Sequence, residues 1–219
     1  ASCRSKVAVF CRHTAALSVR PKQVANHEQR SGHYLVHVVT RACQRKRHEE
    51  ISAAAQQLLA SADSLDIATF VFALSRLAHH GKHRDSSFWQ AAAKILIPRV
   101  GEMSGDVVGL AANAFSRVGV TVPDLMREIS ARVVADVSDM PATALTLVLN
   151  SVVHRGSSGR SDQLEGSIAR HLVGRLHELN DQDAALFFTA LGRDGRVDEG
   201  PAAEAALDLE SQSVAVLQQ

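Results

Sequence analysis

The sequence has 219 residues, of which 46% are hydrophobic and only 4% aromatic, and its net charge is +1. This length can form one large domain or two small ones, and the apolar fraction excludes a disordered chain. Ala, Leu and Val outnumber the aromatic residues, which favours packed helices over a sheet. Since no apolar run approaches the roughly 18 to 20 residues of a membrane span, we expect an all-α protein without such a span.

Residues 1–48 are strongly basic, whereas residues 49–219 are mildly acidic. The first 50 residues hold ten Lys or Arg and three Glu, and residues 1–27 contain no acid. Such a composition is typical of an organellar transit peptide, and equally of a basic extension that lies on a polyanion. At the end of this segment, Arg45, Lys46 and Arg47 either contact phosphates or form a solvated charged run.

The first helical signals lie at 34–44 and 49–62. The later segment, EEISAAAQQLLASA, is typical of the second helix of a hairpin. The earlier one, YLVHVVTRACQ, would be its partner, although the alternation of Val36, Val38 and Thr40 also fits a short strand. Residues 1–48 are therefore either a basic N-terminal arm or a degenerate first unit, followed by an α-helical repeat domain at 49–219.

Helix start and stop signals recur through the rest of the chain. They predict helices at 65–79, 87–101, 104–118, 123–137, 141–155, 161–178, 181–193 and 201–216. The first helix of each pair would be capped by Ser64, Ser104, Asp139 and Asn180 and ended by Gly81, Gly119, Gly156 and Gly195. The second helices would open near Ser87, Pro123, Ser161 and Pro201.

Similar heptapeptides end the first helices, namely FALSRLA, NAFSRVG, NSVVHRG and TALGRDG, which begin at residues 72, 113, 150 and 189. Their basic residues, Arg76, Arg117, His154 and Arg193, are 41, 37 and 39 residues apart. The second helices carry apolar stripes in matching register, including Ala92, Ile129 and Ile168. These spacings predict a right-handed α-solenoid of repeated helical hairpins with about 37–41 residues per repeat.

The segment MSGD at 103–106, the helix ending LAANAFSRVG and the following PDLMREISARVV resemble the heptatricopeptide repeats of protist mitochondrial proteins. These are relatives of octotricopeptide and FAST-kinase-type repeats, and the resemblance covers about residues 49–200. It implies a mitochondrial matrix protein that binds RNA, because members of such families bind organellar RNA and several are subunits of mitochondrial ribosomes. The implied function is a structural ribosomal subunit that binds rRNA and neighbouring proteins.

In a stack of hairpins, residues at one helix position form a row. The row Arg76, Arg117, His154 and Arg193 would contact phosphates, and Phe72, Asn113, Asn150 and Thr189 lie one turn earlier, where polar members would reach base edges. Alternatively, these cations only stabilise the carbonyl ends of their helices. Arg155 and Arg160 flank the loop RGSSGR, which either grips an RNA backbone or only connects two helices.

Other chemistry is not indicated by the sequence. Dinucleotide, phosphate-loop, nucleophile-elbow and zinc-protease motifs are missing, so we predict a non-enzyme without cofactor or small-molecule substrate. Gly81 interrupts the cluster of His79, His80 and His83, which argues against a metal site there. The rival hypothesis is a protein-interaction scaffold in another organellar complex without RNA contact, and the acidic charge of residues 49–219 favours it.

Overall fold

The computed structural model describes residues 21–81, 83–154 and 162–193, and every regular element in these ranges is a helix. The α-helices are α1 (Pro21–Arg45), α2 (His48–Ala60), α3 (Ile67–Arg76), α4 (Ser86–Leu96), α5 (Gly105–Val118), α6 (Pro123–Asp136), α7 (Ala142–His154), α8 (Asp162–Val173) and α9 (Asp181–Arg193). Short 3-10 helices occupy Ala62–Ser64, Ile97–Glu102 and Leu176–Glu178, and a π-helix at Leu77–Gly81 extends α3. The prediction of an all-α protein is confirmed for the described part of the chain.

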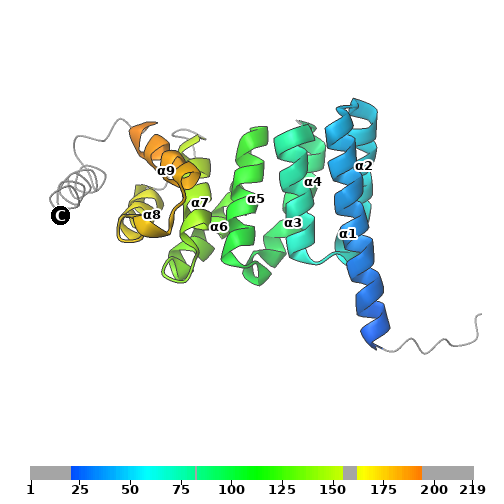
Figure 1. Cartoon of the computed structure of the whole chain (residues 1–219), viewed down its shortest axis with the longest axis horizontal. Coiled ribbons are helices and arrows are strands. Elements are labelled where there is room, and N and C mark those ends of the chain that lie inside the picture. The colour runs from blue at the N-terminus through cyan, green and yellow to red at the C-terminus, as the bar shows by residue number, and fades with distance from the viewer. Residues whose placement is uncertain (1–20, 82, 155–161, 194–219) are drawn as a thin grey trace, which may run out of the picture.

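The helices form two layers (Figure 1). The odd-numbered helices contact one another in sequence, α1 with α3, α3 with α5, α5 with α7 and α7 with α9; we call them the front layer. The even-numbered helices make the corresponding contacts behind them and form the back layer. Each neighbour in a layer is therefore about one hairpin further along the chain.

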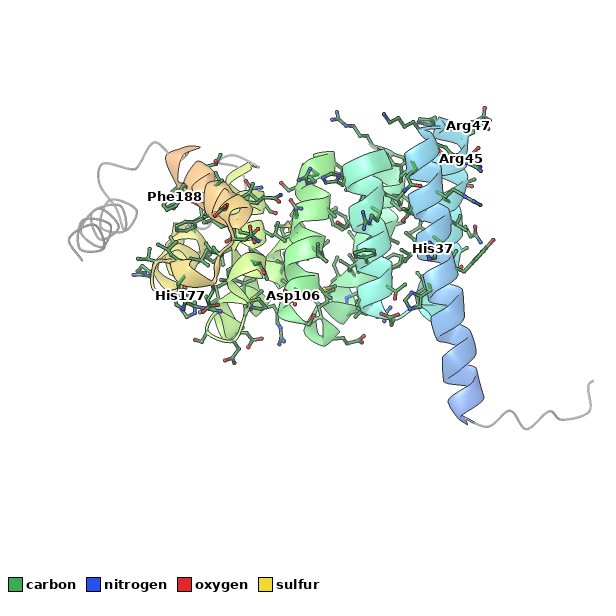
Figure 2. The ribbon with its side chains drawn as sticks, in the orientation of Figure 1. His37, Arg45, Arg47, Asp106, His177 and Phe188 are labelled. Atoms are coloured by element: carbon green, nitrogen blue, oxygen red, sulfur yellow. The ribbon has the colours of Figure 1, made fainter. Side chains whose placement is uncertain are left out.

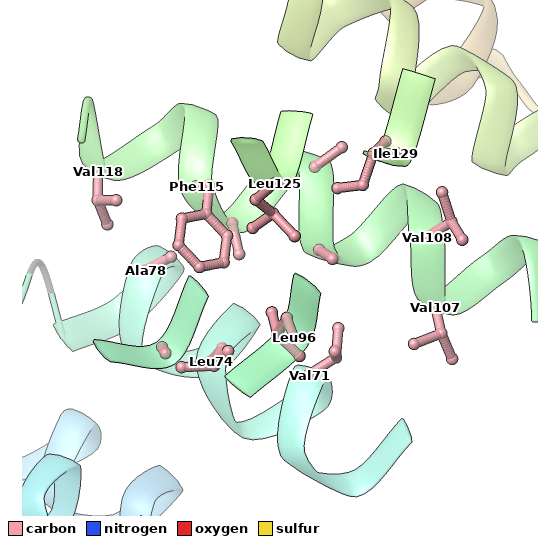
Figure 3. Packing of buried hydrophobic residues seen from close by; sticks show 14 of the residues in the cluster. Val71, Leu74, Ala78, Leu96, Val107, Val108, Phe115, Val118, Leu125 and Ile129 are labelled. Atoms are coloured by element: carbon pink, nitrogen blue, oxygen red, sulfur yellow. The ribbon is translucent and has the colours of Figure 1, made fainter. Parts of the chain in front are cut away.

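A core rich in Leu, Val and Ala runs between the two layers (Figure 3). The apolar stripes that the sequence predicted on the second helices all face it, because Phe88, Leu125, Leu164, Ala92, Ile129, Ile168, Leu96, Val133 and Leu172 are at most 4% exposed. Burying one such Leu or Ile side chain stabilises the fold by about 1.5–3 kcal/mol. The matching register of these stripes is thus a property of the packed core.

The helix ends differ in part from the predicted ones. Asp66, not Ser64, caps α3, and its carboxylate accepts a 2.8 Å hydrogen bond from the Thr69 amide. Asn180 caps α9 and accepts from the Asp183 amide at 2.9 Å, and Gly119 ends α5 at φ 71°, both as predicted. A carboxylate is a stronger acceptor than a hydroxyl and also complements the helix dipole, which explains the shift to Asp66.

Two further helices have the N-cap residues Asp85 and Ser104. The carboxylate of Asp85 accepts from the Ser87 amide at the start of α4, whereas Ser104 makes no side-chain bond at the start of α5. Asp139 does not cap α7 as predicted, because this helix begins three residues later, at Ala142. The predicted ends at Gly156 and Gly195 and the helix at 201–216 lie outside the described residues.

The segment at 34–44 is helical, so its interpretation as a short strand is wrong. In α1, Leu35, Val39, Ala42 and Cys43 are buried and face α2 and α3. These residues recur every three to four positions, which is the spacing of one helix face. This helical spacing decides the structure of the segment, and the two-residue alternation of Val36, Val38 and Thr40 does not. The last turns of α1 therefore belong to the packed body, whereas residues 1–20 lie outside the described part.

Candidate nucleic-acid interface

The predicted row of basic residues lies at the C-terminal ends of front-layer helices. Arg76 ends α3, Arg117 is in the last turn of α5, and His154 and Arg193 are the last residues of α7 and α9. Since α3, α5, α7 and α9 pack in succession, the row joins neighbouring helices. The side chains of His154 and Arg193 are not among those described, and Arg155 and Arg160 lie outside the described residues.

Arg76 is held against an aromatic ring. Its guanidinium carbon lies 4.9 Å from the centroid of Phe72, which is 39% exposed although it is a large apolar side chain. A guanidinium over a ring face gains about 0.5–1 kcal/mol at an exposed site. The pair therefore presents a cation and an aromatic surface side by side on α3.

Arg117 points away from the core. The stripe that contains Ala114, Phe115 and Val118 is buried, whereas Arg117 is exposed and has no hydrogen-bond or ion-pair partner among the described residues. One turn earlier, Asn113 is half-buried, and Asn150 is half-buried at the same position of α7. Arg117 can contact a ligand, and it also lies where a cation stabilises the carbonyl end of its helix.

Arg45, Lys46 and Arg47 form the turn between α1 and α2 (Figure 2). Lys46 follows the last residue of α1, and its backbone is in the left-handed region at φ 55°. The Nη1 atoms of Arg45 and Arg47 lie 3.4 and 3.1 Å from the carboxylate of Glu50. Such surface pairs stabilise by at most about 1 kcal/mol, and one carboxylate paired with two arginines beside Lys46 leaves the turn positive.

Charge is separated along the front-layer helices. Asp66, Asp106, Asp181 and Asp183 lie at or near the N-terminal ends of α3, α5 and α9, opposite to the cations at the C-terminal ends. Figure 2 shows Asp106 at one edge of the molecule and Arg45 and Arg47 at the other. We call the side formed by Arg45, Lys46, Arg47, Arg76 and Arg117 the basic edge. Its cations complement the helix dipoles, and cations at one edge are the chemistry that would recognise a polyanion.

A groove of about 570 Å³ lies along α1, and the predicted site did not include it. The lining residues are Tyr34, His37, Val38, Thr40, Arg41 and Gln44. None of these residues belongs to the predicted row of Arg76, Arg117, His154 and Arg193. A spacing of three to four residues is the signal that places Tyr34, His37, Arg41 and Gln44 on one helix face.

One member of the histidine cluster, His83, is part of the packed core. His83 is buried, its carbonyl oxygen accepts a 2.7 Å hydrogen bond from Trp89 Nε1, and its ring lies 5.0 Å from that of Phe88. Burial lowers the pKa of His83, an effect that His48 reinforces and Asp85 opposes. Among the described residues, no group of three or more His, Cys, Asp or Glu is arranged to hold a metal ion.

The sequence matches no protein-family model, and no curated protein is significantly similar to it. No helix in the described ranges is long and apolar enough to cross a membrane. The fold and site define an all-helical, two-layered protein with a basic edge along its front layer.

Proposed function

We propose that the protein is an α-solenoid that contacts RNA along its front layer, as a structural subunit of a mitochondrial ribosome. The observation that carries the proposal is the gathering of cations at the C-terminal ends of successive front-layer helices, with the acids at the other ends. The resemblance to heptatricopeptide repeats and the acid-free basic segment at 1–27 support the mitochondrial and ribosomal assignment.

In this proposal the basic edge binds the phosphates of rRNA. Arg117 is exposed and Arg76 is oriented by Phe72, so both guanidinium groups are positioned to donate to phosphate oxygens. Asn113 and Asn150 lie one turn back and supply amide groups for base edges or 2′-hydroxyls. The acidic N-terminal ends of the front-layer helices would face protein neighbours.

The test compares two arginines that both lie in the last turn of a helix. Arg117→Gln removes a cation from the basic edge, whereas Arg170→Gln removes one from α8 in the back layer. We expect Arg117→Gln to weaken RNA binding and to lower the slope of log affinity against log salt by about 0.7–0.9, because one phosphate contact is lost. Arg170→Gln should leave both quantities unchanged.

The same variants separate an RNA contact from a helix-end role. An exposed cation at a helix end contributes only about 0.3–1 kcal/mol, so the melting temperature of Arg117→Gln should change little. A lower melting temperature with unchanged RNA retention would assign Arg117 to helix termination.

A second candidate function is a protein scaffold in an organellar complex without RNA contact. The acidic ends of the front-layer helices favour it, because Asp66, Asp106 and Asp181 could dock a basic protein surface. The two candidates differ in sedimentation of the native assembly. An RNA-contacting subunit co-sediments with rRNA and is released by nuclease, whereas a scaffold subunit stays in its complex after nuclease treatment.

A further inference from the structure

Exposed aromatic side chains lie on several front-layer helices. Among the exposed large apolar residues in the described ranges, Tyr34 (63%), Phe72 (39%) and Phe188 (44%) lie on α1, α3 and α9, and only Val134 lies on a back-layer helix. Exposure of an aromatic ring to water costs free energy, and stacking on a planar partner removes part of this cost. The most exposed of them, Tyr34, lines the α1 groove.

The groove combines this ring with hydrogen-bond donors and a cation. His37, Thr40, Arg41 and Gln44 line it together with Val38, and none of the lining residues that the structure describes carries a carboxylate. Its volume of about 570 Å³ falls within the range of about 300–1,000 Å³ that small-ligand sites occupy. The groove is therefore suited to a ligand with a flat ring and a negative charge.

We propose that the α1 groove binds an unpaired nucleotide of single-stranded RNA. The base stacks on Tyr34, and the phosphate that joins it to the next nucleotide pairs with Arg41. This inference rests on the proposed function and adds to it a defined site and the single-stranded form of the ligand. Gln44 and Thr40 supply the polar contacts to the base edge or the ribose.

The helix geometry fits an extended strand. Tyr34 and Arg41 are separated by two helical turns, about 10.5 Å along the axis, and both side chains are long enough to reach toward each other along the groove. Gln44 is followed in the sequence by Arg45, which is the first residue of the basic edge. A strand seated in the groove can thus continue along the phosphate-binding cations without reversing direction.

Duplex RNA does not fit the same chemistry. In a duplex the faces of the bases are stacked on one another, so a protein ring cannot reach them, and recognition uses the backbone and the 2′-hydroxyls. Unpaired bases stack on aromatic side chains with a gain of about 1–3 kcal/mol per base. The exposure of Tyr34 therefore selects for single strands.

Negative charge alone does not define the ligand of the groove. An acidic protein segment satisfies the charge but offers no base for Tyr34. It is one of the outcomes that the following experiment distinguishes.

Tyr34 is the single tyrosine of the chain, which permits a site-specific probe. Full-length protein labelled with 3-fluorotyrosine has one ¹⁹F resonance, and it reports on Tyr34 alone. We expect short oligoadenylate to shift this resonance in a saturable way, and a duplex of the same length and charge density to leave it in place. Polyglutamate, which supplies negative charge without bases, should leave it in place as well.

Substitutions test the energetic contribution of the ring. Tyr34→Phe retains the stacking surface and should bind oligoadenylate as the unmodified chain does, whereas Tyr34→Leu should weaken binding about 5- to 150-fold. The matched control is Val134→Ala, which trims an exposed apolar side chain on α6 in the back layer and should have no effect. Because Tyr34 is largely exposed, none of these changes should unfold the protein.

Four results distinguish RNA binding in the α1 groove from its alternatives. A ¹⁹F shift with oligoadenylate and a loss of affinity in Tyr34→Leu support the proposal. RNA binding that leaves both the resonance and the affinity of Tyr34→Leu unchanged overturns the α1 site but not the basic edge. Complete absence of RNA binding overturns the proposed function and the α1 site together. A shift with polyglutamate but not with oligoadenylate would assign the groove to an acidic protein partner and overturn the proposal.

Discussion

Arg175 Nη1 donates a 2.7 Å hydrogen bond to the Met140 carbonyl oxygen and so ties the end of the α8 hairpin to the start of α7. Its guanidinium also contacts Glu178 through two bonds of 2.8 and 2.6 Å. Arg99 makes the same arrangement two hairpins earlier, with a bond to the Leu65 carbonyl oxygen at 3.4 Å and one to Glu102 at 3.2 Å. An arginine thus closes two of the hairpins in the same way.

We expect Arg175→Gln to lower the free energy of unfolding by about 1–2 kcal/mol, because it removes charge-assisted hydrogen bonds from a half-buried site and leaves the Met140 carbonyl unpaired. The control is Arg127→Gln, which breaks exposed pairs with Asp124 and Glu128 and should cost at most about 1 kcal/mol. Urea denaturation of both variants measures the difference. Equal losses would show that the bond to Met140 does not close the hairpin.

The contact between α5 and α7 depends on the absence of a side chain at Gly109. A Cβ atom there would lie 2.9 Å from the Cα of Ala144 and 3.0 Å from its carbonyl oxygen, whereas a Cβ on Gly166 of α8 meets nothing within 4 Å. Gly109→Ala should therefore destabilise by about 1–3 kcal/mol, because backbone atoms must move. Gly166→Ala should stabilise by about 0.5–1 kcal/mol, since alanine is the better helix former.

Thermal denaturation of this pair tests the close approach of the two front-layer helices. Both variants make the same chemical change inside a helix, so the intrinsic preference for alanine cancels in the comparison. If Gly109→Ala were as stable as Gly166→Ala, α5 and α7 would have to pack less closely than described.

Much of this fold was predictable from repetition in the sequence. Ile129 and Ile168 were matched by offset alone, and both are fully buried between the layers. The helix predicted at 161–178 was too long: α8 ends at Val173, and the chain turns so that Arg175 can reach Met140. That bond depends on a residue 35 positions away, which local helix signals do not contain.

The site was less predictable than the fold. The row of basic residues could be placed because it repeats with the helices, although only Arg76 and Arg117 have described side chains. The separation of acids from cations along the front layer could not be predicted from charge sums over sequence segments, since it depends on which helix ends lie together. The pairs Arg99 with Glu102 and Arg175 with Glu178 recur in the sequence, but only their shared contact to a distant carbonyl gives them a role.

The buried ring of His83 should make stability depend on pH. Burial lowers its pKa below the ordinary value of 6.5, so the unfolded chain takes up a proton at a higher pH than the folded chain. The stabilising contribution is therefore present above about pH 6.5 and is lost as the pH falls below it, by at most about 1.4 kcal/mol per pH unit. Melting temperatures between about pH 7.5 and pH 5.5 measure the effect.

His83→Gln should flatten this dependence, whereas His37→Gln, which changes an exposed residue of α1, should preserve it. Asp85 and His48 also act on His83, but Asp85 titrates in the acidic range and does not change its charge in this window. Parallel pH profiles for His83→Gln and the unmodified chain would contradict the assignment.

Cys43 reports on whether α1 stays docked on the helical body. Its thiol is 2% exposed and lies 3.7 Å from the Arg76 carbonyl oxygen, and burial raises its pKa although Arg76 opposes this effect. A thiol reagent attacks the thiolate and needs access to it, so labelling requires α1 to move away from α3.

In a chain that carries Cys3→Ser and Cys11→Ser, native Cys43 should react at least about 100-fold more slowly than in urea. Val39→Ala, which leaves a cavity under α1, should speed the native reaction, and Val134→Ala on α6 should not. Equal labelling rates with and without urea would mean that α1 is not part of the packed body, and the α1 groove would then lack the rigid helix on which its stacking site depends.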